Sequence, residues 1–416
     1  MKNLNEKIVS RQAALMSEIL ETLVPQVLDR GPPADRVLAR FFKRRRELGS
    51  RDRRFLSEGF FSFFRWLGWT QPLGVAPLEA AALSWLLDRT EIHPALAAAA
   101  GDRELLGGKT LDEKRDALSG WFDREFENTG LIPSALEKSI HLPAGCEALF
   151  YETLQQRPPT WLRLRSEAFK QTLAEADIAF TEHPRLPAAV SIPAGRSLGA
   201  LGSSGQFEVQ DIASQAVGAV AAPEKRSDWW DACAGAGGKA LQLADAVGRD
   251  GKVFATDVRP EALANCKKRA RTDGIRNVRM QEHDLAKDDP FTKEFDGVLI
   301  DAPCSGWGTW SRNPDARWRS DPRDPAQKRN LQLRMLQNAA QCVKSGGVLI
   351  YAVCTFTREE TTEVLERFLT DHSEFAPEPF AHPLTGELTE GVLQIWPWEG
   401  PGDGMFIARL CRKAAA

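Results

Sequence analysis

The sequence of 416 residues lacks long hydrophobic runs. No apolar stretch approaches the roughly 18–20 residues that a helix needs to cross a bilayer. The first residues, Met1–Lys7, are polar and lead into a helical pattern, so we expect no secretory signal peptide. The composition, 43% hydrophobic and 27% charged, is typical of a soluble globular protein. We therefore expect a cytoplasmic protein that does not contact a membrane.

Cysteine is sparse, and no pair of cysteines has the CxxC spacing. The seven residues are scattered: Cys146, Cys233, Cys266, Cys304, Cys342, Cys354 and Cys411. Their odd number and irregular spacing argue against a disulfide scaffold or a zinc ribbon and indicate a reducing compartment. We expect no metal site, and each thiol is free to fill the core or to take part in chemistry.

The chain also lacks an excess of positive charge, because it has 54 Lys and Arg but 57 Asp and Glu, which gives a net charge of −3. The bulk charge therefore does not indicate a nucleic-acid-binding protein, although an average hides local patches. One basic patch lies at residues 43–54, where a solvated helix face and RNA contact are equally good interpretations. We favour RNA contact for a second patch, which consists of Arg312, Arg317, Arg319, Arg323, Lys328, Arg329 and Arg334.

The chain is longer than one hydrophobic core usually accommodates, so we expect two or three domains. The first, residues 1–140, has the pattern of helices, with apolar residues at helical spacing over 11–28, 34–48, 55–69 and 77–87. The stretch 55–69 is almost entirely apolar, which predicts a buried central helix. Its aromatic residues resemble a base-stacking platform, but on such a helix we assign them to the core.

Residues 141–222 have a different pattern. Pro158-Pro159 precedes a short alternating stretch at 161–165, then a helical segment and short strands punctuated by proline. This pattern predicts a small α+β module of two or three strands.

From Trp229 onward, strand-like runs alternate with helical ones. The candidate strands are 229–232, 252–257, 277–280, 295–301 and 347–353. Such alternation indicates βαβ units, so residues 223–416 should form an α/β domain with a mostly parallel, doubly wound sheet. Ligands of these sheets bind at the carboxyl ends of the strands, where acidic and cysteine residues fall here.

A glycine-rich loop, Asp231–Lys239, follows the first of these strands and precedes a helix. Glycines let the backbone approach a ligand, and a helix N-terminus offers N–H donors. Asp257 closes the second strand about 20 residues later, where a carboxylate can bind ribose hydroxyls, and Asp284 follows the third. A P-loop is excluded, since no Ser or Thr follows Gly238-Lys239. The nucleoside of S-adenosylmethionine fits best, with a dinucleotide site or a purely structural turn as alternatives.

Two cysteines lie at the ends of the next two strands, in Asp301-Ala302-Pro303-Cys304-Ser305-Gly306 and Tyr351-Ala352-Val353-Cys354-Thr355. Adjacent parallel strands would deliver both thiols to one edge of the sheet, beside a carboxylate. C5 of cytosine is a poor nucleophile until a group adds to C6, and a thiolate is well suited to that addition. A carboxylic acid can hold the base, which has to be unstacked to reach such a pocket.

The chain resembles the RNA cytosine-C5 methyltransferases of the Sun (Fmu) type, and in particular the RsmB-like members that act on small-subunit rRNA. The resemblance covers nearly the whole chain and rests on 231–239, 301–306, 351–355, 312–315, 205–211 with Ser214, and 403–409. It implies a class I S-adenosylmethionine-dependent methyltransferase fold, Rossmann-like, after a small RNA-recognition-like subdomain. It also implies an N-terminal all-helical domain similar to the antitermination factor NusB, through residues 34–65.

The resemblance further implies roles for individual residues. Cys354 is the implied nucleophile toward C6, Cys304 assists breakdown of the covalent adduct, and Asp301 and Lys239 hold the cytosine. The implied S-adenosylmethionine contacts are Cys233, Ala234, Gly235, Ala236, Gly237, Gly238, Lys239, Asp257, Asp284 and Asp301. The implied partner is RNA, either naked or in a partly assembled small ribosomal subunit, and we expect a monomer.

The chain departs from the pattern of the family at four positions. Ala236 replaces a usual Pro, Ala240 a usual Thr, Ala262 a common basic residue and Arg165 a common Asn; Arg259 could substitute for the missing basic residue. Two other interpretations stay open. One is a non-catalytic RNA-binding or ribosome-assembly protein that keeps the fold. The other is a nicotinamide-dependent oxidoreductase, in which the paired cysteines would have no role.

Overall fold

The computed structural model of the protein describes residues 6–29, 31–196, 198, 205–287 and 291–414. The chain forms two units. The first consists of residues 1–157 with 310–322, and the second of residues 158–309 with 323–416. No helix of the described residues is both long enough and apolar enough to span a bilayer.

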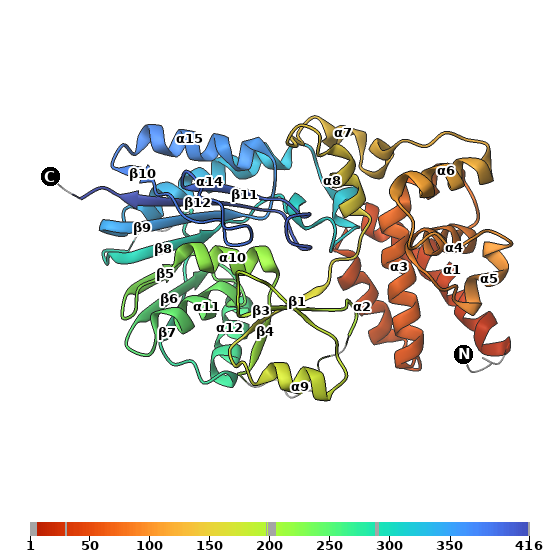
Figure 1. Cartoon of the computed structure of the whole chain (residues 1–416), viewed down its shortest axis with the longest axis horizontal. Coiled ribbons are helices and arrows are strands. Elements are labelled where there is room, and N and C mark those ends of the chain that lie inside the picture. Colours follow the sequence, from red (N-terminus) through yellow and green to blue (C-terminus); the bar gives the residue numbers. More distant parts are fainter. Residues whose placement is uncertain (1–5, 30, 197, 199–204, 288–290, 415–416) are drawn as a thin grey trace. The chain divides into compact units, whose positions relative to one another are not determined.

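The first unit is helical (Figure 1). Its helices are α1 (Glu6–Leu28), α2 (Ala34–Arg44), α3 (Ser50–Thr70), α4 (Pro77–Asp88), α5 (Pro94–Ala100), α6 (Leu111–Phe122), α7 (Ser134–Glu137), α8 (Glu147–Leu154) and α13 (Ala316–Arg319), with 3-10 turns η1 (Gln71–Leu73) and η2 (Asn128–Leu131). The predicted central helix is confirmed as α3, whose Phe60, Phe64 and Trp66 are fully buried. These aromatic side chains belong to the core, as expected, because no face of them is open to a base.

The segment 310–322 belongs to this helical unit, although the sequence placed it in the third domain. Asp315 Oδ2 accepts a hydrogen bond from the amide of Ala34 at 3.0 Å, and Trp318 Nε1 donates to the carbonyl of Phe64 at 2.7 Å. The Arg317 guanidinium is 0% exposed and donates to the carbonyl of Arg65. The favoured RNA contact of Arg317 is therefore wrong, because packing against α3 removes its side chain from solvent. The division into three domains stays a prediction.

The second unit begins with a small antiparallel sheet. Its strands are β1 (Thr160–Leu164), β2 (Thr181–Glu182), β3 (Ala189–Ile192) and β4 (Phe207–Val209), in the order β2-β3-β1-β4, with helix α9 (Phe169–Glu175). The sequence predicted two or three strands, and the described residues form four. The shortest, β2, has two exposed residues and hence no apolar pattern to reveal it.

A larger sheet of eight strands forms the centre of this unit. Its strands are β5 (Asp228–Asp231), β6 (Lys252–Asp257), β7 (Val278–Glu282), β8 (Phe295–Asp301), β9 (Val343–Val353), β10 (Phe375–Pro377), β11 (Val392–Ile395) and β12 (Met405–Arg412). The order is β10-β12-β9-β8-β5-β6-β7, with β11 paired to β12. The run β9-β8-β5-β6-β7 is parallel, and β10, β11 and β12 are antiparallel. All five predicted strands are confirmed.

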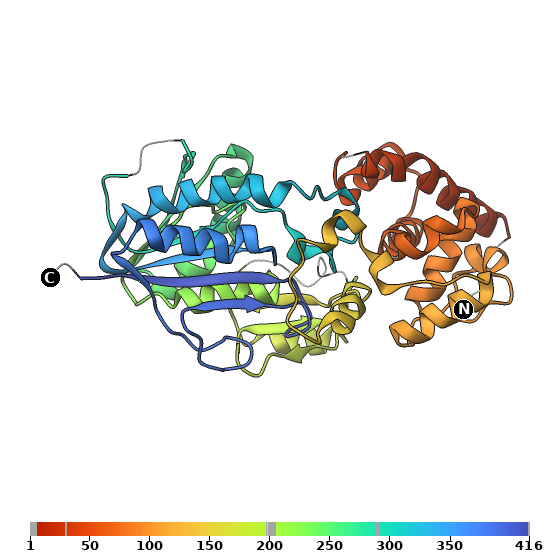
Figure 2. The same cartoon turned by 90° about the horizontal axis from the view of Figure 1, so that it is seen from above.

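Helices cover both faces of this sheet, so it is doubly wound as predicted (Figures 1 and 2). On one face, α10 (Ile212–Ala221) and α11 (Gly238–Val247) pack their apolar residues against the strands. On the other, α14 (Asp324–Ala340) and α15 (Thr362–Asp371) do the same. Helix α12 (Pro260–Thr272) connects β6 to β7, and the 3-10 turns η3 (Trp307–Thr309) and η4 (Arg358–Glu360) follow β8 and β9.

Two arginines, one in β1 and one directly after it, connect the small sheet to the layer of helices on the large sheet. Arg163 Nη1 and Arg165 Nε both bond to Asp245 of α11, at 2.8 and 2.9 Å. Arg165 also forms ion pairs with Glu208 and Asp273. Arg165, one of the four departures from the family pattern, therefore holds the two sheets together, since it is the shared partner of three carboxylates.

Candidate active site

A cavity of about 740 Å³ opens at the carboxyl ends of β5, β6 and β8. Its lining includes the predicted cofactor residues Cys233, Ala234, Gly235, Ala236, Gly238, Lys239, Asp257, Asp284 and Asp301, together with Ser214 and Asp231. Gly237 is absent from the lining of the described residues. Gly237 makes the turn into α11 with a φ of +92°, which favours glycine. It also packs closely against α12, because a Cβ at this position would lie only 2.4 Å from Cys266 Sγ.

Asp231 is a site residue that the sequence argument missed. Its side chain is 0% exposed, its Oδ1 accepts from the amide of Cys233 at 3.3 Å, and its Oδ2 has no hydrogen-bond partner among the described residues. Burial, followed by the charge of Asp301, raises the pKa of Asp231 to about 7. A buried carboxylate oxygen beside a cavity calls for a cationic or donor group from a ligand. The ammonium and sulfonium groups of S-adenosylmethionine fit this requirement. The signal in the sequence was the place of Asp231, at the end of a strand before the glycine loop.

The raised pKa of Asp231 gives a prediction for stability. The ordinary pKa of 3.8 governs the unfolded chain and the value of about 7 the folded one, so folding is penalised increasingly as pH rises between these values. The penalty is absent below about pH 4 and amounts to about 4 kcal/mol at pH 8. We expect Asp231→Asn to raise the urea midpoint of the ligand-free protein at pH 8 and to change it little near pH 4.5. An equal shift at both pH values would contradict this account.

Asp257 closes β6 at the edge of the cavity, as predicted. Its carboxylate accepts from the amide of Gly235 at 2.8 Å and from the amide, Nε and Nη2 of Arg259 at 2.9, 2.9 and 3.0 Å. Burial acts to raise the pKa of Asp257, but the hydrogen bonds outweigh it, so the pKa is lowered. Asp284 accepts from the amide of Ala286 at 3.1 Å and also lines the cavity. The lowered pKa keeps the Asp257 carboxylate ionised, and both side chains line the cavity in which a ligand would bind.

Lys239 and Asp301, which both line the cavity, form an ion pair with Nζ and Oδ2 2.7 Å apart. Burial acts to lower the pKa of Lys239, and the charge of Asp301 outweighs it, so the pKa is raised. The ammonium group of Lys239 also interacts electrostatically with Cys354. This pair thus connects the cavity to the cysteines.

Cys304 and Cys354 meet as the order of the strands predicted. Strand β8 pairs with β9 so that Asp301 faces Ala352, and a few residues further the two Sγ atoms lie 3.3 Å apart. Both side chains are partly exposed. The predicted convergence of the two thiols is confirmed, and their individual roles stay predictions.

The surroundings of the two sulfur atoms differ in charge. The hydrogen bond with Cys354, burial, and the negative charges of Cys354 and Glu360 raise the pKa of Cys304 well above its usual value. Cys304 is therefore held as a neutral thiol. The positive charge of Lys239 interacts electrostatically with Cys354. These surroundings keep the proton on Cys304.

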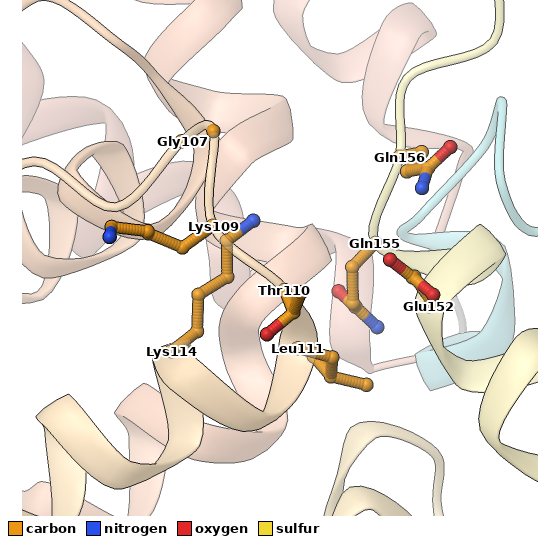
Figure 3. A pocket seen from close by; sticks show the side chains of 9 residues that line it. Gly107, Lys109, Thr110, Leu111, Lys114, Glu152, Gln155 and Gln156 are labelled. Atoms are coloured by element: carbon orange, nitrogen blue, oxygen red, sulfur yellow. The ribbon is translucent and has the colours of Figure 1, made fainter.

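The helical unit has a cavity of its own, of about 270 Å³, at the N-terminus of α6. Lys114 and Glu152 lie on opposite sides of it (Figure 3). The ammonium of Lys114 lies 5.0 Å from the centre of the Trp66 ring. Because the lining carries charges of both signs, it favours neither an anion nor a cation, and it lacks the paired thiols of the larger cavity.

The chain is similar to known methyltransferases. The family described as 16S rRNA methyltransferase RsmB/F matches residues 219–411. The chain is 31% identical over 300 residues to ribosomal RNA small subunit methyltransferase B of Sodalis glossinidius, covering 69% of this chain and 67% of that protein. It is 35% identical over 251 residues to the probable ribosomal RNA small subunit methyltransferase B of Synechocystis, covering 58% of this chain but only 56% of the relative.

A solved structure supports the fold. The crystal structure of PH0851 has a TM-score of 0.73 at 24% identity, with 98% of this chain and 99% of that chain covered. At that identity it supports the arrangement of helices and strands and no more. With the relative from Sodalis matched over two thirds of its length, the chain belongs to the RsmB/F family of 16S rRNA methyltransferases.

Proposed function

We propose that the protein methylates C5 of a cytosine in RNA, most directly in small-subunit rRNA, with S-adenosylmethionine as the methyl donor. We further propose that it acts as a monomer in the cytoplasm. The observation that carries the proposal is the 3.3 Å approach of the Cys304 and Cys354 sulfurs beside the Lys239–Asp301 pair and the cavity. A dinucleotide-dependent oxidoreductase would have no use for paired thiols at this place.

The cofactor would lie in the 740 Å³ cavity, held by the glycine loop, Asp231, Asp257 and Asp284. When bound, it supplies an electrophilic methyl group. Asp301 lines the same cavity and pairs with Lys239, so a cytosine held by this pair would lie beside the cofactor site. Such a base has to be flipped out of its stack.

The residues then act in sequence. The Cys354 thiolate forms a bond to C6, and the electron pair of the C5–C6 double bond becomes available at C5. Asp301 accepts from the exocyclic amine, while the proton of Lys239 stabilises the negative charge that the addition moves toward N3 and O2. S-adenosylmethionine, held by the glycine loop, Asp231, Asp257 and Asp284, would supply the methyl group to the activated C5, and the sulfur–methyl electron pair would remain with the donor.

Release reverses the addition. The proton on C5 leaves to water, its bonding electrons restore the C5–C6 double bond, and the C6–S pair returns to Cys354. The neutral thiol of Cys304, 3.3 Å away, donates a hydrogen bond to the departing sulfur. The raised pKa of Cys304 supports this role, because only a protonated thiol can donate.

We also propose that the helical unit binds RNA. Arg36, Arg40, Lys43 and Arg44 are exposed at helical spacing along α2, and no ion-pair partner for them exists in the described part of the chain. By contrast, Arg45 pairs with Glu18. The opposite side of the helix packs into the core, so these four cations are free to contact phosphates.

Arg259 provides a test of the cofactor site. Its side chain is 60% exposed and fills acceptor positions of Asp257 that ribose hydroxyls would need. We expect Arg259→Ala to bind S-adenosylmethionine about two- to fivefold more tightly and Asp257→Ala at least about tenfold more weakly, as judged by isothermal titration calorimetry. Weaker binding by Arg259→Ala would instead assign a direct cofactor contact to the arginine.

The test of the proposed function uses the purified protein, tritiated S-adenosylmethionine and small-subunit RNA, either deproteinised or in the assembled subunit. We expect label at a single cytosine that bisulfite sequencing reads as 5-methylcytosine. A non-catalytic RNA-binding protein would bind RNA without transferring label, and an oxidoreductase would bind NAD in preference to S-adenosylmethionine. Either result would overturn the proposal.

A further inference from the structure

Glu360 is a buried carboxylate with no assigned role. It ends the turn η4, between β9 and α15, and its side chain is 0% exposed. No cation pairs with it among the residues that the structure describes. A carboxylate that is buried without a cation has to be stabilised by hydrogen-bond donors, since nothing else replaces the solvation that it loses.

The side chain of Glu360 accepts four hydrogen bonds. Oε1 accepts from the amide of Ser305 at 2.8 Å and from Nε2 of Gln332 at 3.1 Å. Oε2 accepts from Thr357 Oγ1 at 3.0 Å and from Ser305 Oγ at 2.5 Å. The donors come from the loop after β8, the loop after β9 and helix α14, so a single carboxylate joins three elements.

These contacts hold the neighbours of both catalytic thiols. Ser305 directly follows Cys304, Thr355 directly follows Cys354, and their hydroxyl oxygens lie 3.1 Å apart. Gln332 Nε2 also donates to the carbonyl of Pro303 at 3.1 Å, so the residues on both sides of Cys304 are fixed. The backbone of Glu360 is anchored in turn, because its carbonyl accepts from the Tyr351 hydroxyl at 2.7 Å. We call this set of bonds the Glu360 clamp.

We propose that Glu360 is a positioning residue that sets the distance between the Cys304 and Cys354 sulfurs. This inference rests on the proposed function. Ser305 donates two of the four hydrogen bonds to the Glu360 side chain, whereas Gln332 and Thr357 donate one each. The clamp therefore acts mainly on the position of Cys304. Addition to C6 needs only Cys354, whereas breakdown of the adduct needs Cys304 within hydrogen-bond reach of the Cys354 sulfur. Loss of the clamp therefore slows release more than it slows addition.

The spacing can be measured without RNA. A diazene dicarboxamide oxidant takes two electrons and two protons from the thiols of Cys304 and Cys354 and becomes the hydrazine, as the two sulfurs form a disulfide. We expect the linked peptide in mass spectrometry to form about tenfold more slowly in Glu360→Gln than in the wild type, because the glutamine amide cannot accept the bonds of Oε2 and the loops separate. Glu363→Gln is the matched control, since it removes a half-buried carboxylate three residues away, which pairs with Arg329.

The second measurement is single-turnover kinetics with RNA. In Glu360→Gln we expect adduct formation within about threefold of the wild type and adduct breakdown slowed about tenfold to hundredfold, so that protein–RNA adduct accumulates on denaturing gels. Glu363→Gln should behave as the wild type. If Glu360→Gln does not fold, Ser305→Ala, which removes one hydroxyl of the clamp, takes its place.

The outcomes separate this inference from the proposed function. If the wild-type protein does not methylate RNA, the proposed function is wrong. The rate of disulfide formation still tests the clamp in that case. A folded Glu360→Gln protein with wild-type rates of disulfide formation and adduct breakdown overturns the clamp. So does a variant in which addition and breakdown slow by the same factor, because that pattern shows a general structural defect.

Discussion

Cys354→Ala loses methylation by about a thousandfold or more. Without the sulfur nothing adds to C6, and C5 of cytosine stays too weak a nucleophile to take a methyl group. In the proposed mechanism the Lys239–Asp301 pair, at 2.7 Å, holds the base and assists the addition, but it cannot replace the attacking sulfur. The measurement is transfer of tritium from S-adenosylmethionine to small-subunit RNA at saturating concentrations of both.

Two controls keep this result specific. S-adenosylmethionine should bind Cys354→Ala as it binds the wild type, because the cysteine does not line the cofactor cavity described above. Cys146→Ala removes another partly exposed thiol, at the start of α8 in the helical unit, and should keep full activity. Full activity of Cys354→Ala would show that the nucleophile has been assigned to the wrong residue.

Cys304→Ala has the second largest effect, and it is of the opposite kind. Addition and methyl transfer proceed, but the departing sulfur of Cys354 no longer has a donor 3.3 Å away. We expect turnover to stop near one methyl group per enzyme, with the RNA covalently attached. The amount of adduct is measured as labelled RNA that migrates with the protein on a denaturing gel. We expect at least about tenfold more adduct than in the wild type.

The double variant Cys304→Ala, Cys354→Ala is the control for that trap. It should form no adduct, because the attacking sulfur is gone. If Cys304→Ala turns over at the wild-type rate without a trapped complex, another group expels Cys354, and the neutral thiol next to it has only a structural role.

The five parallel strands and the pair of thiols could be predicted from the sequence, because the signals are local. Strand-like runs alternate with helical ones, and residues at the ends of neighbouring parallel strands meet at one edge. Cys304 and Cys354 are 50 positions apart, yet each is tied to a strand end that the pattern reveals. The same rule placed Asp257 and Asp301 at the cofactor cavity.

The remaining features depend on burial, which a local pattern does not show. Arg317 lies in a run of basic residues typical of a solvated surface, but its partner is the carbonyl of Arg65, 252 positions earlier. Glu360 follows another glutamate in a polar stretch, and only the packing of η4 under α14 makes it a buried acceptor. Asp231 was counted as the start of a loop, whereas its unpaired oxygen is its main chemical property.

The most direct test of paired thiols acting on one base uses RNA with 5-fluorocytosine in place of cytosine. Fluorine at C5 does not leave as a proton does, so the methylated adduct persists, and mass spectrometry identifies the attached residue. We predict one linked peptide, in which the base is bound through the sulfur of Cys354. The mass of this peptide should include the methyl group only when S-adenosylmethionine is present. A base attached to Cys304, or no adduct from a protein that methylates ordinary RNA, would contradict it.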